Sequence, residues 1–389
     1  MNTRPLSEVR KGLSVKWYRS PVESAVLREL TKRSDLQGWM QALGHFLLFL
    51  ATGTLTFWMW YQRIWIGFAA SMFLHGTVTS FFNGVAPHEL AHGTVFRTKW
   101  LNKFFMYLFS LITWWDPFDY ALSHTYHHRY TLYPEGDQEN LLPLKPSVGA
   151  TFLLQMFTVN IFSRPGRAFG KGGLIAALLS TGRTALGLKD NSTGLAATWL
   201  RALHEDQPRE ARKSVWWSRA IVLFHGGVLV FSILSGYWVV SLLITVAAFT
   251  GKWASYFVGL PQHCGLRDNV ADFRKCVRSM RLGPILTFLY WRMNWHAEHH
   301  MYAAVPCYNL EKLARTIADD MPKPKSLLGA WKEMREIWKR QQSQPAYQYD
   351  TPLPATAAPE GGGDGKSGAP APVDELEKSI GELAPEGLT

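Results

Sequence analysis

The chain has 389 residues, including 17 Trp, 22 Phe and 14 Tyr, and its formal net charge is +11. An aromatic content this high is typical of membrane proteins, whose amphipathic rings lie at the level of the lipid headgroups. Three cysteines with no CxxC pair among them speak against a disulfide framework and against an iron–sulfur cluster held by the chain.

The first 39 residues are expected to form a basic cytosolic arm. Basic residues are spread among polar ones here, and the apolar core of a signal peptide is missing. A short helix is predicted from Val22 to Thr31. We therefore expect the first apolar segment, which begins near Met40, to remain in the bilayer.

Four apolar segments are predicted to cross the membrane as two hairpins. Residues 40–61 carry no formal charge over 22 positions, which is enough to cross about 30 Å of hydrocarbon, and residues 64–82 return the chain. Residues 216–235 and 237–258 form the second hairpin. The apolar stretch at residues 101–115 is too short for a full crossing and is predicted to be an interfacial or half-buried helix.

The segments around these hairpins complete one membrane domain, residues 40–320. Residues 152–162 are predicted to form an amphipathic helix at the membrane surface, and residues 284–293 an apolar helix. A cytosolic helix is expected at residues 321–340. The fold class is therefore all-α: four transmembrane helices with a cytosolic helical cap.

The tail, residues 341–389, is rich in Pro, Ala and Gly and becomes acidic near its end. Such a composition buries too little apolar surface to offset the entropy of ordering. We predict that the tail is disordered, apart from a short helix at residues 373–384.

Eight of the 13 histidines lie in three windows of five residues. In a helix, positions i, i+3 and i+4 lie on one face, so each window presents its imidazoles in one direction. Eight imidazoles are too many for one ion of four to six ligands, which predicts two ions. The windows are His88-Glu89-Leu90-Ala91-His92, His124-Thr125-Tyr126-His127-His128 and His296-Ala297-Glu298-His299-His300.

Lys and Arg are frequent before residue 40, between residues 87 and 219, and after residue 261. The turns inside the two hairpins carry only Arg63. The positive-inside rule then predicts that both termini and all three windows are cytosolic, so that the cap carries a di-metal site. The same distribution accounts for the high pI without nucleic-acid binding.

The remaining histidines have ordinary interpretations. His45, His75 and His225 lie in predicted spans, where a neutral ring that bonds to a neighbouring helix is expected more often than a metal ligand. His204 is predicted to lie in a loop.

Several acids are candidates for holding a ligand imidazole by its second nitrogen, a contact that metal sites need. Glu89 and Glu298 lie inside the windows, and the alternative for each is a solvated acid. Asp116, Asp119 and Asp137 are further candidates for the same role.

Arg274, Arg278 and Arg281 recur at helical spacing beside Lys275. One interpretation is attraction to anionic lipid headgroups. The other is a docking surface for an acidic electron carrier, which electrostatics would steer.

In order, spacing and position relative to the spans, the three windows resemble the HxxxH, HxxHH and HxxHH boxes of the membrane fatty acid desaturase superfamily. The resemblance covers about residues 40–320 and includes the segment that follows His300. It implies a non-haem di-iron oxidoreductase that uses O2 and two external electrons to attack an unactivated C–H bond.

The resemblance also implies the ligands. Family members often add a histidine between the second and third boxes, and His263 is the candidate on the cytosolic side of the last span. The implied ligands of the two Fe ions are His88, His92, His124, His127, His128, His263, His296, His299 and His300.

Two features of the sequence limit which members of the superfamily it resembles. The first box has three residues between its histidines and the third begins with His, so neither an acyl-CoA substrate nor a front-end desaturase is implied. The chain has no His-Pro-Gly-Gly haem motif and no flavin or nicotinamide fingerprint. Electrons are therefore expected from a separate protein of the ferredoxin or cytochrome b5 type, and the substrate is a membrane lipid or acyl chain.

Four functions are compatible with the residues. The first is a lipid desaturase and the second a hydroxylase or monooxygenase on the same scaffold. The third is a zinc metalloprotease, because residues 88–92 also match HExxH, although this leaves six box histidines unexplained. The fourth is a membrane metal carrier or sensor, which would favour ligands inside the spans.

Overall fold

The computed structural model describes residues 4–139, 146–163, 172–188 and 195–361. These residues are mostly helical, as predicted, with one short parallel pair of strands, β1 Met280–Arg281 and β2 Lys325–Ser326. Residues 362–389, including the helix expected at 373–384, lie outside the described part of the chain.

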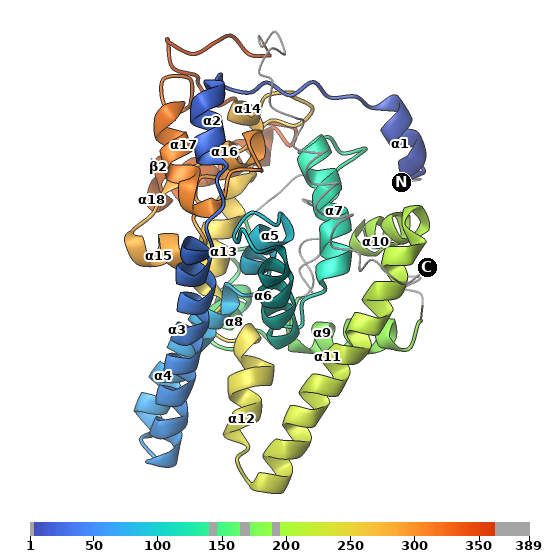
Figure 1. The fold of residues 1–389 in the computed structure, drawn as a ribbon, viewed down its shortest axis with the longest axis vertical. Helices are drawn as coiled ribbons and strands as arrows, with labels where there is room; N and C mark the ends of the chain where they lie inside the picture. The colour runs from blue at the N-terminus through green and yellow to red at the C-terminus, as the bar shows by residue number, and fades with distance from the viewer. Residues whose placement is uncertain (1–3, 140–145, 164–171, 189–194, 362–389) are drawn as a thin grey trace.

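The first hairpin consists of α3 Asp35–Tyr61 and α4 Trp65–Ser80. The Ser34 side chain caps α3 by accepting a hydrogen bond from the Gln37 amide at 3.4 Å, and such a cap typically stabilises a helix by about 1 kcal/mol. The helix consequently begins at Asp35, before the predicted start at Met40. The two helices pack along each other (Figure 1).

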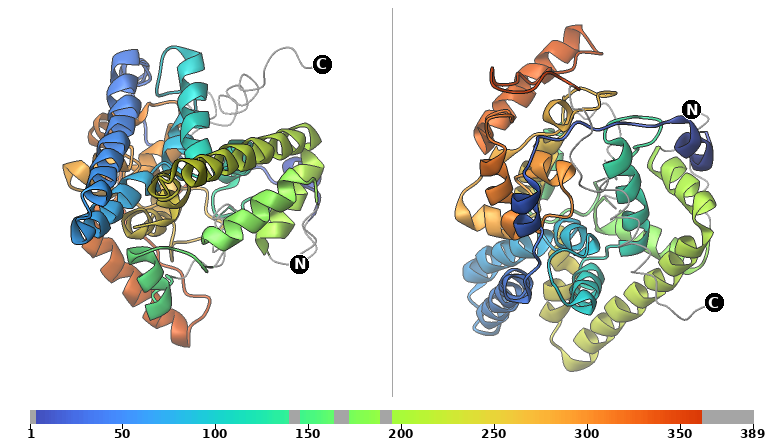
Figure 2. Two further views of the ribbon diagram at one scale, coloured as in Figure 1. Left: turned by 90° about the horizontal axis from the view of Figure 1, so that it is seen from below. Right: turned by 45° about the horizontal axis from the view of Figure 1, so that its top comes forward.

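The second hairpin begins with α11 Pro208–Ser235, which ends at Gly236 with a φ of 77°. This left-handed conformation is favourable for glycine at a helix end. The chain returns through α12 Val239–Ser241, η1 Leu242–Val246 and η2 Ala247–Phe249. Seen from below, α12 lies between the first hairpin and α11 (Figure 2).

Large apolar side chains are exposed along both hairpins. On α11, Leu223, Ile233 and Leu234 are 75%, 69% and 82% exposed, and on α3 Leu47 and Trp58 are 53% and 49% exposed. Soluble proteins rarely expose so many large apolar side chains along one helix, and in a membrane lipid tails would cover them. Among the described residues, α3 and α11 are long and apolar enough to cross a membrane.

The fourth expected span is not one continuous helix. The helix ends before Thr250 and resumes as α13 Trp253–Gly259. Between them Gly251 has a φ of 58°, and a Cβ on it would lie 2.7 Å from the carbonyl oxygen of Phe73. On α4, a Cβ on Gly76 would lie 2.4 Å from the carbonyl oxygen of Thr250. The two backbones therefore touch where the helix is interrupted.

The three histidines inside the hairpins bond to neighbouring helices, as expected. Each ring donates from Nε2 to a backbone carbonyl and accepts at Nδ1. For His75, the acceptor is the Leu243 carbonyl at 2.9 Å and the donor is the Thr52 hydroxyl at 2.9 Å. Both nitrogens are used, so these rings are neutral links between helices.

The other central helices form a cap at the end of the hairpins opposite to their tips (Figure 1). Its core is aromatic: the rings of Phe82 and Phe109 stack at 4.2 Å, and Trp291 is fully buried. The helices of the cap are α5 Val85–Ala91, α6 Lys99–Ile112, α7 Pro117–Tyr130, η3 Leu260–Gln262, α14 Phe273–Cys276, α15 Pro284–Leu289, α16 His296–Met301, η4 Cys307–Asn309 and α17 Leu310–Thr316.

Six helices lie around this core. Three of them, together with α15 and α6, correspond to the shorter helices expected from the sequence. His204 lies on a helix, not in the loop expected, and its Nε2–H donates to Asp119 at 2.7 Å. The six are α1 Leu6–Gly12, α2 Ser24–Leu30, α8 Ala150–Phe157, α9 Leu174–Ala185, α10 Leu195–Asp206 and α18 Leu327–Ser343.

The first part of the expected disordered tail, residues 344–361, lies against the cap. We call it the C-terminal strap. The Tyr349 amide donates to the carbonyl of Gly265 at 2.8 Å, and the ammonium of Lys275 lies 2.9 Å from Asp350. Backbone hydrogen bonds and ion pairs hold the strap in place. The prediction of disorder, which rested on low apolar content, is therefore wrong for these residues.

The basic residues around Arg278 are not exposed at the surface. Arg274, Lys275 and Arg278 are 0%, 6% and 7% exposed, and each is paired with a carboxylate. They do not form one helical face either, because α14 ends at Cys276. Both interpretations of this cluster are therefore wrong for these three residues, whose charges hold the cap together; Arg281 is exposed.

Replacing Arg274 with alanine is expected to lower the free energy of unfolding by about 3–5 kcal/mol, because it leaves buried carboxylates without a cation. The guanidinium lies 2.7 Å from both Asp272 and Asp320. Thermal unfolding in detergent measures the change. The control is Arg315→Ala, whose exposed pair with Glu311 is worth less than about 1 kcal/mol. Equal losses in the two variants would contradict the prediction.

Candidate metal centre

The first histidine box follows directly from the first hairpin. Four residues after α4, Gly84 starts α5 with a φ of 86°, and a Cβ there would meet the Trp115 ring at 3.4 Å. His88 lies in α5, and His92 is the residue that ends it. Both imidazoles are thus one helical turn apart on the same short helix.

The other two boxes also lie on helices with defined starts. The Asp116 carboxylate caps α7 by accepting from the amides of Phe118 and Asp119, and Pro117 occupies the first position, where its missing N–H costs nothing. Before α16, Trp291 and Arg292 have φ values of 51° and 58°. This turn reverses the chain after α15 and directs α16 towards α5 and α7.

Nine imidazoles converge into two groups. Within each group one ring nitrogen from each histidine lies within 4.8 Å of the others, and none of the nine residues is more than 6% exposed. All eight box histidines and His263 are included, as the sequence analysis expected. One group contains His88, His92, His124, His128 and His299, and the other contains His127, His263, His296 and His300.

The second and third boxes each contribute to both groups, which differs from the single direction expected. In α7, His124 and His128 belong to the larger group and His127 belongs to the smaller one. In α16, His296 and His300 belong to the smaller group and His299 belongs to the larger one. At about 100° per residue, positions i+3 and i+4 diverge by about 100° and straddle position i. The HxxHH spacing therefore serves two neighbouring centres from one helix.

The nitrogens that face the centres have the arrangement of metal ligands. In the larger group, the Nε2 atom of each histidine is buried without a hydrogen-bond partner. In the smaller group, Nε2 of His296 lies 3.0 Å from Nε2 of His263 and 3.2 Å from Nε2 of His300. Two nitrogens at about 2.1 Å from one ion and at right angles to each other are about 3.0 Å apart. The residues therefore fit a pair of metal ions.

On five of these rings, the opposite nitrogen, Nδ1, is held by a hydrogen-bond acceptor. A carboxylate can only accept, so Nδ1 carries the hydrogen and Nε2 keeps its lone pair for a metal. The five contacts are His88 with Glu89 at 2.9 Å, His124 with Glu139 at 3.1 Å, His127 with Asp137 at 2.8 Å, His263 with the Cys276 carbonyl at 3.1 Å and His300 with Thr131 at 3.2 Å.

The acids named from the sequence have different positions. Glu89 contacts His88 and lies 3.8 Å from His299, so it lies between the first and third boxes. Asp137 makes the expected contact with a box histidine, since its carboxylate accepts from Nδ1 of His127 at 2.8 Å. Glu298 instead accepts from the Ser279 hydroxyl at 2.5 Å.

The other two acids lie at the far side of α7. Asp119 pairs with His204 and Asp116 accepts from the Ser214 hydroxyl at 2.6 Å. Glu139 and Thr131 were missed. Both follow α7 in an irregular segment, where no periodic pattern indicates which way a side chain points.

Burial determines the charge of this site. Desolvation lowers the pKa of His88 and of His92 to about 3, and raises the pKa of Glu89 to about 7. For the other box histidines except His127, burial also holds the pKa well below its usual value. These seven rings are therefore neutral near pH 7, which is the form that binds metals.

Comparison with known proteins agrees with this geometry. The family model described as fatty acid desaturase matches residues 63–329, from the turn between α3 and α4 to the first turn of α18. The match includes all nine histidines. No curated protein matches closely enough to count as a relative. Because the matched segment is well over half of the sequence, this chain belongs to the fatty acid desaturase family.

Proposed function

We propose that this protein introduces a double bond into the acyl chain of a membrane lipid, with O2 as the oxidant and two iron ions as the metal centre. Its family consists of membrane-associated oxidoreductases that act on lipids. The observation that carries the proposal is the convergence of nine buried imidazoles into two adjacent groups.

Each group would hold one ion, His88, His92, His124, His128 and His299 the first, and His127, His263, His296 and His300 the second. Bound iron would supply the reduction of O2 and the removal of hydrogen from an unactivated C–H bond. Per double bond, two neighbouring carbons each lose one hydrogen. Those two hydrogens, O2, two electrons and two protons give two water molecules, which balances the reaction.

The chain itself orients the ligands and excludes water. The Nδ1 contacts of five rings fix their orientation and raise the basicity of Nε2. Burial of all nine rings keeps bulk water from the centre, which protects a reactive site from side reactions. Glu89 holds Nδ1 of His88 at 2.9 Å, and its carboxylate lies 3.8 Å from Nδ1 of His299, beyond hydrogen-bond distance.

The position of the centre suits a substrate that comes from the bilayer. Only residues 81–84 separate the apolar helix α4 from the first box helix α5. The first box is therefore held directly at the end of an apolar hairpin, which supports a substrate that approaches from the bilayer.

We also infer the membrane layout. The hairpins of residues 40–320 cross the membrane four times, and the cap, the N-terminal arm, the helix around residues 321–340 and the tail are cytosolic. The inference is supported by the common end at which both hairpin tips lie (Figure 1) and by the basic residues at the opposite end.

The histidine groups argue against the zinc metalloprotease hypothesis. His88 and His92 share their group with three further histidines, whereas a catalytic zinc keeps an open position beside three ligands. Glu89 bonds to a ligand ring and not into an open cleft.

Mass spectrometry of lipids tests the proposal. Cells that express the protein should accumulate acyl chains that have lost two hydrogens, and the purified protein should contain about two irons per chain. The control is a strain that expresses the Arg315→Ala variant, which leaves the histidine groups intact. A product that gains one oxygen would instead indicate a hydroxylase, and one zinc per chain would indicate a hydrolase.

A further inference from the structure

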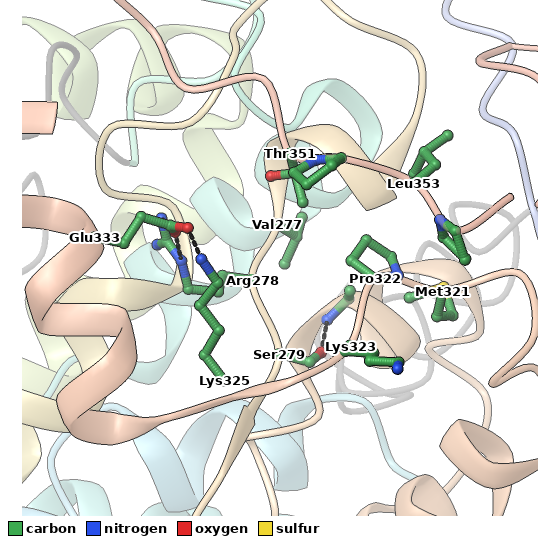
Figure 3. Close-up of a pocket in the computed structure, with 13 residues that line it drawn as sticks. Val277, Arg278, Ser279, Met321, Pro322, Lys323, Lys325, Glu333, Thr351 and Leu353 are labelled. Carbon is green, nitrogen blue, oxygen red and sulfur yellow. Dashed lines mark hydrogen bonds and ion pairs between the residues drawn. The ribbon is translucent and has the colours of Figure 1, made fainter. Parts of the chain in front are cut away.

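A pocket of about 340 Å³ lies beside α16, whose Ala297 is one of its lining residues. The other walls of the pocket are shown in Figure 3. Its walls are mostly apolar and come from segments far apart in the sequence. They include Val277, Met321 and, from the C-terminal strap, Thr351 and Leu353. The strap thus closes one side of a cavity that the rest of the cap leaves open.

The pocket is close to the proposed metal centre through the backbone. Ala297, which lines it, is the chain neighbour of His296. The Ser279 hydroxyl fixes this wall, because it accepts from the Ala297 amide at 3.1 Å and donates to Glu298 at 2.5 Å. The helix that carries His296, His299 and His300 to the two groups therefore also lines the pocket, through Ala297.

The pocket is positively charged. Its lining contains three cations and one acid, Glu333. Arg278 is buried in the wall, so the basic rim that a partner could contact consists of Lys323 and Lys325. Glu333 is shared by two of the cations, since it pairs with Arg278 at 2.8 Å and also with Lys325. Two positive charges remain in excess, and the Lys323 side chain is exposed.

We propose that this pocket and its basic rim are the docking surface for a small acidic protein that carries one electron. The inference rests on the proposed function, which consumes two electrons per double bond. Since the nine histidines are buried, no carrier protein can touch the metal centre. Electron transfer slows steeply with distance, so a carrier needs a surface from which the path is short.

The structure offers this path along α16, from Ala297 at the pocket to His296 in the smaller histidine group. An apolar hollow with a cationic rim is complementary to a carrier with acidic residues around an apolar contact. Two reduced carriers, each oxidised by one electron, supply the pair of electrons that O2 needs in addition to the two substrate hydrogens and two protons.

The test uses the iron-loaded, full-length protein in lipid nanodiscs, with a reduced acidic ferredoxin as the probe. The variant is Lys323→Glu. The matched control is Lys312→Glu, which makes the same charge change on the exposed face of α17 outside the pocket. Each preparation is also assayed with dithionite, a small reductant that needs no docking surface.

For Lys323→Glu, the KM for ferredoxin should rise by about 5- to 10-fold at low ionic strength, with a smaller difference in high salt. The ratio of ferredoxin-supported to dithionite-supported turnover should fall for Lys323→Glu and stay constant for Lys312→Glu. Lys323→Arg, which keeps the charge, should restore the ratio.

Equal effects of the two charge reversals, or a wild type that turns over with dithionite but not with ferredoxin, would overturn the docking surface. These results would leave the desaturase assignment intact. Conversely, pocket-dependent oxidation of ferredoxin without a new double bond in the lipid would retain the docking surface and refute the proposed reaction.

Discussion

Replacement of His296 by alanine is expected to abolish lipid oxidation and to lower the iron content from about two ions to about one per chain. His296 lies at the middle of the smaller histidine group, with its Nε2 atom 3.0 Å from that of His263 and 3.2 Å from that of His300. Product formation should fall by more than about 100-fold, because even outer contacts of metal sites contribute 10- to 100-fold.

The control for this variant is His204→Ala. His204 is a histidine of the same cap, but it pairs with Asp119 on the far side of α7 and belongs to neither group. Iron content and product should be retained. If the His296 variant kept two irons, the assignment of the smaller group as a metal site would be wrong.

The histidine site was largely predictable, because it is encoded locally. The spacing of each box needs only a helical turn to bring two imidazoles together, and α5, α7 and α16 provide it. The family resemblance implied that these three helices face one another, whereas periodicity alone did not. His263 belongs to no box, and only the fold brings it within 3.0 Å of His296.

Contacts between distant segments were not predictable. The interruption at Gly251 arises because α4 presents Gly76 and a bare backbone to it, and an apolar sequence does not reveal such a partner. Arg274 was interpreted as a surface charge from its spacing with Arg278 and Arg281. Its partner Asp320 is distant in the sequence, and only the fold brings the two together. Ion pairs that form only in the fold bury the basic cluster, which was expected at the surface, and order the C-terminal strap, which was expected to be disordered.

Asp137→Asn is expected to weaken iron binding and to lower turnover by about 10- to 100-fold. Asp137 is fully surrounded by donors: its Oδ2 accepts from Nδ1 of His127 at 2.8 Å and from the Leu132 amide at 2.9 Å, and its Oδ1 accepts from the Glu139 amide at 3.0 Å. A carboxylate satisfies all three, whereas an amide has only one accepting oxygen. In either orientation the new NH2 group meets a donor, so His127 loses its fixed orientation or the loop after α7 shifts.

Competition with a chelator of known affinity measures the iron binding, and the same preparations give the turnover. Asp119→Asn is the matched control, because Asp119 is also a buried acid that pairs with a histidine, but that histidine is His204. Removing this carboxylate should leave iron affinity within about twofold of the wild type. Equal losses in the two variants would mean that the cap is only destabilised in general. A selective loss in Asp137→Asn would identify the carboxylate as the group that aims His127 at its ion.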